Sequence, residues 1–257
     1  MTIKIGPAGT GGDSYKGLQM IKEAGLDAVE IEFVRGVKMS NETAKKIGEL
    51  NKKLGLILSI HAPYYINLNS EEKPKIEASK QRILQSCERG HHLGARCIVF
   101  HASYYGKSTP EECYDATKEA IIGMQKKIKE NEWDVILCPE TTGKGSQFGT
   151  VDELVKLSRE TGCGICVDFA HVYARNNGRI DYDDVMGKIK RIKHLTAHFS
   201  GINFTAKGER NHELTPPERI RELYKYLKKY NISITIINES PDPMGDALKM
   251  KRMLKEV

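Results

Sequence analysis

The sequence predicts a (β/α)8 barrel, in which eight parallel strands form a closed ring inside a layer of helices. Three observations support this fold. Eight apolar runs of strand length alternate with eight amphipathic segments, at intervals of about 25 to 40 residues, the size of a βαβ unit. No linker rich in Pro, Gly or Ser divides the 257 residues, so we expect one domain spanning 1–257. Acids and histidines end six of the apolar runs, where barrels carry their active sites.

The predicted strands are short apolar runs that begin close to the N-terminus and recur along the whole chain. They span Ile3–Ile5, Ala28–Phe33, Leu56–His61, Arg96–His101, Val135–Glu140, Gly164–Asp168, His194–Phe199 and Ile232–Glu239. An open doubly wound sheet is the alternative, but such sheets usually carry a GxGxxG phosphate loop after an early strand. The segment Gly9–Gly12 is rich in glycine without matching that pattern, so we interpret it as the first loop of a barrel.

Amphipathic helices are predicted between the strands. They span Ser14–Ala24, Asn41–Leu54, Lys75–Leu93, Pro110–Lys129, Val151–Thr161, Tyr182–Ile192, Pro217–Lys228 and Met244–Lys255. Ser40 and Thr150 stand at N-cap positions, and Asp152 and Glu153 place acid in a first turn. Four glycines follow helices where a left-handed cap is favoured, namely Gly25, Gly55, Gly94 and Gly162.

The composition excludes some classes of protein, but it does not identify a binding partner. The 40 basic and 34 acidic residues give a net charge of +6, which is compatible with nucleic acid binding without indicating it. No apolar run approaches the roughly 20 residues of a membrane span, and the N-terminus enters a strand directly, so we expect a cytoplasmic protein without membrane contact. The six cysteines include one CxxC, Cys163–Cys166, which we interpret as structural because it opens a strand.

The residues that end the strands are chemically unusual. They are His61, His101, Glu140, Asp168, His198 and Glu239, and His171 follows Asp168 by three positions. Such side chains are costly to bury unless they are paired or coordinated, and convergence of all seven by accident is improbable. Histidine and carboxylate together are ligands of zinc-type cations. We expect one pocket with two metals, bridged by Glu140 or Glu239 and suited to phosphoryl chemistry.

Several motifs resemble those of the endonuclease IV family of apurinic/apyrimidinic endonucleases, which are xylose isomerase-like TIM barrels. His61–Leu68 (HAPYYINL) resembles the signature of that family's third strand, and Val167–His171 (VDFAH) resembles its Asp-x-x-His segment. Glu140–Gly145 (ETTGKG) resembles the Glu-x-x-x-x-Gly loop, His198 stands where the family has a histidine in strand seven, and Glu239–Pro241 (ESP) resembles the final Glu-Thr-Pro. The resemblance runs from the second strand to the C-terminus.

The resemblance implies three zinc ions in the barrel. His61, His101 and Glu140 would hold the first, and Glu140 would bridge to a second held with Asp168, His198 and Glu239. His171 would hold the third together with an Asp-x-His pair, but this chain reads Lys207–His212 (KGERNH) there. Glu209 and His212 are the expected pair, although their spacing is one residue longer, and Asn211 is the alternative to the histidine. We therefore expect two or three ions, with zinc as the metal and manganese as the alternative.

The resemblance further implies hydrolysis 5′ to abasic sites in duplex DNA by a monomer, with Glu140 as the catalytic carboxylate. The expected DNA-binding residues are Arg35, in a short loop after strand two, Tyr64 and Asn67 in the third-strand signature, and Arg210. Two alternatives stay open. A sugar isomerase or epimerase would use only Glu140, Asp168, His198 and Glu239 around one ion. A damage-binding protein without turnover would fit the short loop and the altered 207–212 stretch.

Overall fold

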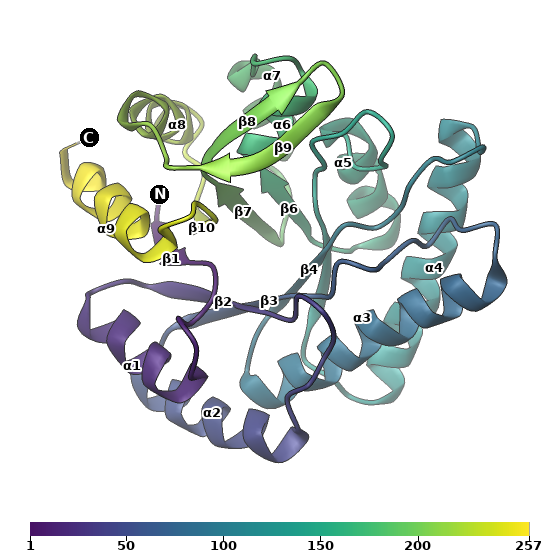
Figure 1. Ribbon diagram of the computed structural model, residues 1–257, viewed down its shortest axis with the longest axis horizontal. Helices are drawn as coiled ribbons and strands as arrows, with labels where there is room; N and C mark the ends of the chain where they lie inside the picture. The colour runs from purple at the N-terminus through teal and green to yellow at the C-terminus, as the bar shows by residue number, and fades with distance from the viewer. Residues whose placement is uncertain (257) are drawn as a thin grey trace.

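The computed structural model describes residues 1–256 and has eight parallel strands in a ring that is surrounded by helices (Figure 1). The strands are β1 (Ile3–Pro7), β2 (Ala28–Glu32), β3 (Ile57–His61), β4 (Cys97–Phe100), β5 (Ile136–Pro139), β6 (Ile165–Asp168), β7 (Leu195–Phe199) and β10 (Ile234–Asn238). They pair in the orders β1-β10-β7-β6 and β2-β3-β4-β5. Parallel bridges from Ala8 to Glu30 and from Glu140 to Cys166 connect the two halves, which confirms the predicted barrel.

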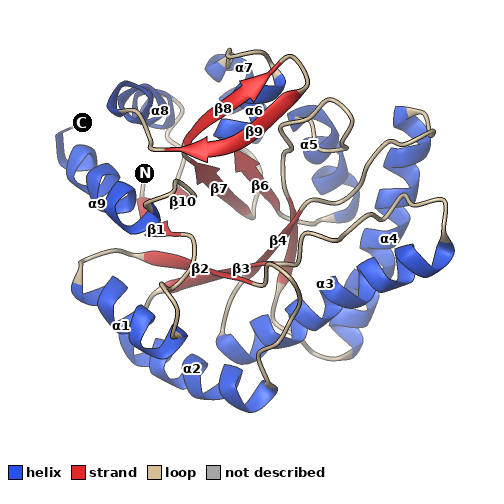
Figure 2. Cartoon of the chain, viewed as in Figure 1, coloured by secondary structure: helices blue, strands red, loops and turns tan. Residues whose placement is uncertain are grey.

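The helices follow the strands in sequence and cover the outside of the ring (Figure 2). They are α1 (Ser14–Glu23), α2 (Asn41–Leu54), α3 (Lys73–Leu93), α4 (Pro110–Glu130), α5 (Val151–Thr161), α6 (Phe169–Arg175), α7 (Tyr182–Ile189), α8 (Pro217–Lys229) and α9 (Pro243–Met253), followed by a 3-10 turn at Leu254–Glu256. The side chains of Ser40 and Thr150 cap α2 and α5 as expected. The four glycines after helices have φ between 67° and 78°.

Two elements were not expected from the sequence. The short helix α6 begins directly after Asp168, whose side chain accepts a hydrogen bond from the backbone N–H of His171. The antiparallel hairpin of β8 (Gly201–Thr205) and β9 (Gly208–Glu213) follows β7. Five of the seven residues of α6 are buried, so it lacks the alternation of polar and apolar faces that reveals a surface helix in a sequence.

Helix α1 ends one residue earlier than its sequence pattern suggested, and two other expected helices end two or three residues earlier. Helix α7 stops at Ile189 rather than Ile192, because the backbone N–H of Ile192 bonds to the carbonyl of Ile189 in a tighter turn. Helix α9 stops at Met253 and continues as a 3-10 turn. Ends of helices often tighten in this way. No helix within residues 1–256 is long and apolar enough to cross a membrane.

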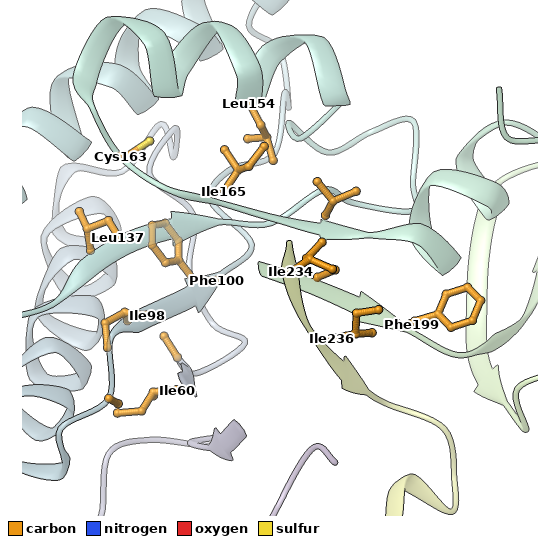
Figure 3. Packing of buried hydrophobic residues seen from close by; sticks show 14 of the residues in the cluster. Ile60, Ile98, Phe100, Leu137, Leu154, Cys163, Ile165, Phe199, Ile234 and Ile236 are labelled. Atoms are coloured by element: carbon orange, nitrogen blue, oxygen red, sulfur yellow. The ribbon is translucent and has the colours of Figure 1, made fainter. Parts of the chain in front are cut away.

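The alternation of side chains along the strands decides which residues reach the interior of the barrel. Ile98 and Phe100 join the large apolar core that packs between strands and helices (Figure 3), whereas Val99 joins a small interior cluster with Cys138 and Cys166. Because side chains alternate with a period of two, the residues two positions beyond those interior residues also face inward. These inward residues at the strand ends include His101, Glu140 and Asp168, which places them at one end of the barrel.

Candidate metal centre

Glu140 lies at the centre of the cluster formed by the strand-end residues. Its Oε2 is 3.2 Å from Nε2 of His61 and 3.0 Å from Nε2 of His101. Its Oε1 is 3.0 Å from Nδ1 of His198 and 3.3 Å from Nδ1 of His171. The residue is 1% exposed. A buried carboxylate whose two oxygens face different histidines has the geometry required to connect two cation sites.

A first potential ligand group contains His61, His101 and Glu140, whose ligand atoms lie within 4.8 Å of one another. Nδ1 of His61 is 2.8 Å from the carbonyl oxygen of Ala62, so this nitrogen carries the proton and Nε2 is directed toward Glu140. Neutral imidazole held in this way is a typical metal ligand. His61 is the last residue of β3, and His101 and Glu140 directly follow β4 and β5; these three strands are neighbours in the barrel.

A second group contains Glu140, Asp168, His198 and Glu239, again with ligand atoms within 4.8 Å. Nδ1 of His198 is 3.2 Å from Oε1 of Glu239. One oxygen of Asp168 caps α6, while the buried Oδ2 has no hydrogen-bond partner. Buried polar atoms normally have a partner, so an orphaned carboxylate oxygen among these acids and imidazoles fits a bound cation.

A third group surrounds His171. One ligand atom from each of His171, Asp168 and His212 lies within 4.8 Å of the other two. In addition, Oε2 of Glu209 is 3.2 Å from Nε2 of His171. Oε2 of Glu209 is also buried without a hydrogen-bond partner. Both residues chosen from the altered stretch therefore lie beside His171, whereas Asn211 is exposed and donates its Nδ2 hydrogen to the carbonyl of His212.

A β-bulge explains how the longer spacing still brings Glu209 and His212 together. His212 pairs with Ile202 and Asn211 with Asn203, but the next partner of the β8 strand is Glu209, so Arg210 is the extra residue. In a regular strand, residues three apart face opposite sides, and an inserted residue returns them to the same side. The bulge thus offsets the one-residue difference from the family's Asp-x-His pair.

The charges of the cluster strongly perturb its ionisation. Burial alone would raise the pKa of Glu140, but the charges of His101 and His198 hold that pKa well below its usual value. Burial alone would lower the pKa of His61, yet contact with Glu140 and the charge of Glu32 raise it to about 10. Without metal, protonated imidazoles therefore balance the acids. Cations that bind the same nitrogens would displace these protons.

Two acids near the cluster were missed in the sequence. Glu30 and Glu32 are inward-facing residues of β2, and together with Glu239 their ligand atoms lie within 4.8 Å. Burial raises the pKa of Glu32 to about 7, even though the charge of His61 lowers it. The signal in the sequence was a pair of acids two residues apart inside an apolar strand, which is an unusual place for charge.

The expected DNA-binding residues lie in loops and on the hairpin at this end of the barrel. Arg35 is exposed in the β2–α2 loop and lines a pocket together with Glu32. Tyr64 is 52% exposed, with its ring centroid 5.4 Å from that of His61. Asn67 uses its Oδ1 to accept hydrogen bonds from its own and a neighbouring loop. Arg210 is exposed at the bulge. Contact of these residues with DNA stays a prediction.

The remaining histidines and the cysteines agree with ordinary structural positions. His91 and His92 lie in the last turn of α3, and His194 lines a pocket with Arg96 at the opposite end of β7. All six cysteines are free. The sulfur of Cys166 nevertheless lies within 4.8 Å of ligand atoms of Glu140 and His198, because it is the inward residue two positions before Asp168.

Comparison with known proteins gives consistent results. Residues 18–213 match the family model described as xylose isomerase-like TIM barrel. The chain is 37% identical over 258 residues to the uncharacterized protein MJ0133 of Methanocaldococcus jannaschii. That alignment covers 95% of this chain and 93% of the other protein. It is 27% identical over 184 residues to a probable endonuclease 4 of Mycobacterium leprae, covering 70% and 68% respectively.

Solved structures resemble the chain over its full length. The crystal structure of endonuclease IV from Thermus thermophilus superposes with a TM-score of 0.75 at 19% identity, covering 100% of this chain and 98% of that one. A D-tagatose 3-epimerase-like protein superposes with a TM-score of 0.74 at 20% identity, covering 100% and 96%. At these identities the superpositions show a shared fold, and a shared fold does not decide between nuclease and epimerase.

Proposed function

This chain belongs to the xylose isomerase-like TIM barrel family, and from that premise we propose that it is a metal-dependent endonuclease acting 5′ to abasic sites in duplex DNA. The observation that carries the proposal is the presence of three adjoining ligand groups around Glu140 and His171. Relatives named probable endonuclease 4 and apurinic-apyrimidinic endonuclease support it from the sequence side. We propose zinc as the metal because imidazole and carboxylate ligands suit it.

When bound, the cations would polarise the phosphate and make water easier to deprotonate. The side chains of the protein would do the remaining work. Glu140, between the first two groups, would hold and orient the attacking water toward the phosphorus on the 5′ side of the lesion. The oxygen of the water would bond to that phosphorus, and the bond from the phosphorus to the 3′ oxygen of the preceding nucleotide would break. That oxygen would take up a proton to give a 3′-hydroxyl end, and the phosphate would stay on the 5′ side of the abasic deoxyribose. His61 and His198, fixed by their contacts with Glu140, would keep its carboxylate in place.

Residues at the rim of the barrel would bind the DNA. Arg35 and Arg210 are exposed cations that can contact phosphates, which positions a duplex without reading its sequence. Tyr64 is half exposed beside His61, so its ring could contact the nucleotide at the cluster. An abasic nucleotide has no base pair to break, and moving it out of the duplex therefore costs little.

A sugar epimerase is the main alternative, and the superposition on the D-tagatose 3-epimerase-like protein is the observation that favours it. One cation held by Glu140, Asp168, His198 and Glu239 would suffice for that reaction. The additional side chains beside the cluster are more than such a site needs; they are His61, His101, His171, Glu209 and His212. This excess favours the nuclease.

The deciding experiment incubates the purified protein with a labelled duplex that carries one tetrahydrofuran abasic analogue, and counts metals in the same sample. We expect incision on the 5′ side of the lesion by protein that holds two or three zinc ions. An intact duplex of the same sequence and the Glu140→Gln variant are the controls for contaminating nuclease. Fully loaded protein that binds the damaged duplex without cutting it would indicate a binding protein. Protein that neither cuts nor binds, but converts keto-sugars, would establish the epimerase.

A further inference from the structure

Glu30 is a fully buried carboxylate for which the proposed reaction has no use. It occupies an inward position in the middle of β2 and has 0% exposure. A charge in such a place is destabilising unless specific partners compensate for its lost hydration. An apolar residue would fill the same position at lower cost, so the contacts of Glu30 indicate its role.

The two carboxylate oxygens of Glu30 have different partners. Ser59, its register partner on β3, donates its hydroxyl hydrogen to Oε2 at 2.7 Å. Oε1 lies 2.9 Å from Nε2 of His198, which is also 0% exposed. This second contact is close in distance, but its angle is not that of a formed hydrogen bond, and both atoms otherwise have no hydrogen-bond partner.

The other nitrogen of His198 faces the second ligand group. Nδ1 is 3.0 Å from Oε1 of Glu140 and 3.2 Å from Oε1 of Glu239. A neutral imidazole carries one proton, so it can bind a cation through one nitrogen only when the other holds the hydrogen. In known metal sites a carboxylate or carbonyl often accepts that hydrogen, which fixes the tautomer and the ring and raises the basicity of the ligand.

We propose that Glu30 is a positioning residue for the cation of the second ligand group. Its carboxylate, braced by Ser59, accepts the Nε2 hydrogen of His198 and so keeps Nδ1 free for the metal. The inference rests on the metal centre of the proposed function, but not on the nuclease reaction. Glu32, two residues further along β2, lines the pocket that also contains Arg35.

The test measures zinc affinity by chelator competition for the full-length protein and for Glu30→Gln, Glu30→Met and Ser59→Ala. We expect Glu30→Met to lower the affinity for one zinc ion by about 10- to 100-fold and to leave the affinity for the other ions unchanged. Glu30→Gln and Ser59→Ala should lower the affinity for the same ion by smaller factors. Asp246→Asn is the matched control, because Asp246 is a carboxylate that is 4% exposed and contacts Thr215 and Lys249 rather than the cluster. It should leave zinc binding unchanged.

A second readout separates positioning from simple packing. In zinc-loaded protein labelled with ¹⁵N-histidine, the Nε2 hydrogen of His198 should give a protected, downfield proton signal that Glu30→Met removes. Unchanged zinc affinity in Glu30→Met, or survival of that signal, would overturn the proposal. If Glu30→Met fails to fold, Glu30→Gln keeps the shape of the side chain, and its smaller loss of affinity for the same zinc ion is then the result that supports the proposal, while unchanged affinity overturns it. Absence of DNA incision would count against the nuclease alone, because neither readout uses DNA.

Discussion

Oε2 of Glu209 lies 3.2 Å from Nε2 of His171, although the two residues belong to different parts of the chain, the bulged strand β9 and the helix α6. The close approach depends on Gly143 in the β5–α5 loop. A Cβ atom added to Gly143 would overlap Oε2 of Glu209 and would lie 2.9 Å from its Cβ. The backbone N–H of Glu209 also bonds to the carbonyl of Gly143 at 3.2 Å.

Gly143→Ala should therefore displace Glu209 from His171 and weaken the binding of a cation at the third ligand group. We expect one metal ion fewer per molecule, measured by mass spectrometry of the native protein, with the other ions retained. Gly145→Ala is the matched control, since an added Cβ there meets nothing within 4 Å. Equal metal content in the two variants would argue against a third site that includes Glu209.

The histidine of the third site can be identified by a pair of neighbouring substitutions. His212→Ala should lose the same ion, because the ring of His212 lies 5.5 Å from that of His171. Asn211→Ala should keep it, because Asn211 is exposed. The ratio of zinc to protein in both variants checks this expectation. Loss of the ion in Asn211→Ala alone would mean that the asparagine replaces the histidine of the family's pair.

Glu140→Gln should reduce incision of abasic duplex by at least about 10²-fold while the barrel stays folded. The neutral amide can neither bridge two cations nor hold the attacking water as a carboxylate does. Initial rates of cleavage, compared at equal protein concentration, give the magnitude, and circular dichroism reports the fold. Full activity of a folded, metal-loaded Glu140→Gln protein would contradict the role assigned to this residue.

Stability of the metal-free protein should fall as pH rises above neutrality. The pKa of His61 is raised from its ordinary value of 6.5 to about 10, so the folded state binds this proton more tightly than the unfolded state does. The resulting stabilisation is complete below pH 6.5 and is lost as pH rises toward 10. Denaturant unfolding at about pH 6 and about pH 9 should show this loss, and bound zinc should reduce it because His61 is then already neutral. A His61→Gln variant with the same pH slope would exclude His61 as the cause.

Arg210 should contribute to DNA binding through phosphate contact alone. Arg210→Ala is expected to weaken binding to damaged and intact duplexes by similar factors and to reduce the slope of log affinity against log salt by about 1. Metal content should not change. Lys52→Ala is a suitable control, because Lys52 is an exposed cation in the last turn of α2, at the opposite end of the barrel. Equal salt slopes for the two variants would remove Arg210 from the DNA interface.

Much of the fold and many of the candidate ligands could be predicted from local patterns. Strands and helices in a barrel alternate at regular intervals, and caps such as Ser40 and Thr150 depend on a few neighbouring residues. The inward position of Glu140 follows from its strand alone, because side chains alternate along a strand and strand ends meet at one end of a parallel barrel. Proximity of residues on different strands could therefore be expected, although their roles as ligands stay a prediction.

The sequence by itself determined the order of strands and helices and the end of the barrel at which acids and histidines gather, because both depend on periodicity along the chain. Only the tertiary structure decided which nitrogen of His198 faces Glu30, since that contact joins β2 to β7 through the interior. It also decided that a bulge at Arg210 places Glu209 beside His171, because the pairing register of a hairpin depends on both strands. Contacts of these kinds do not produce a repeating pattern of residues in the sequence.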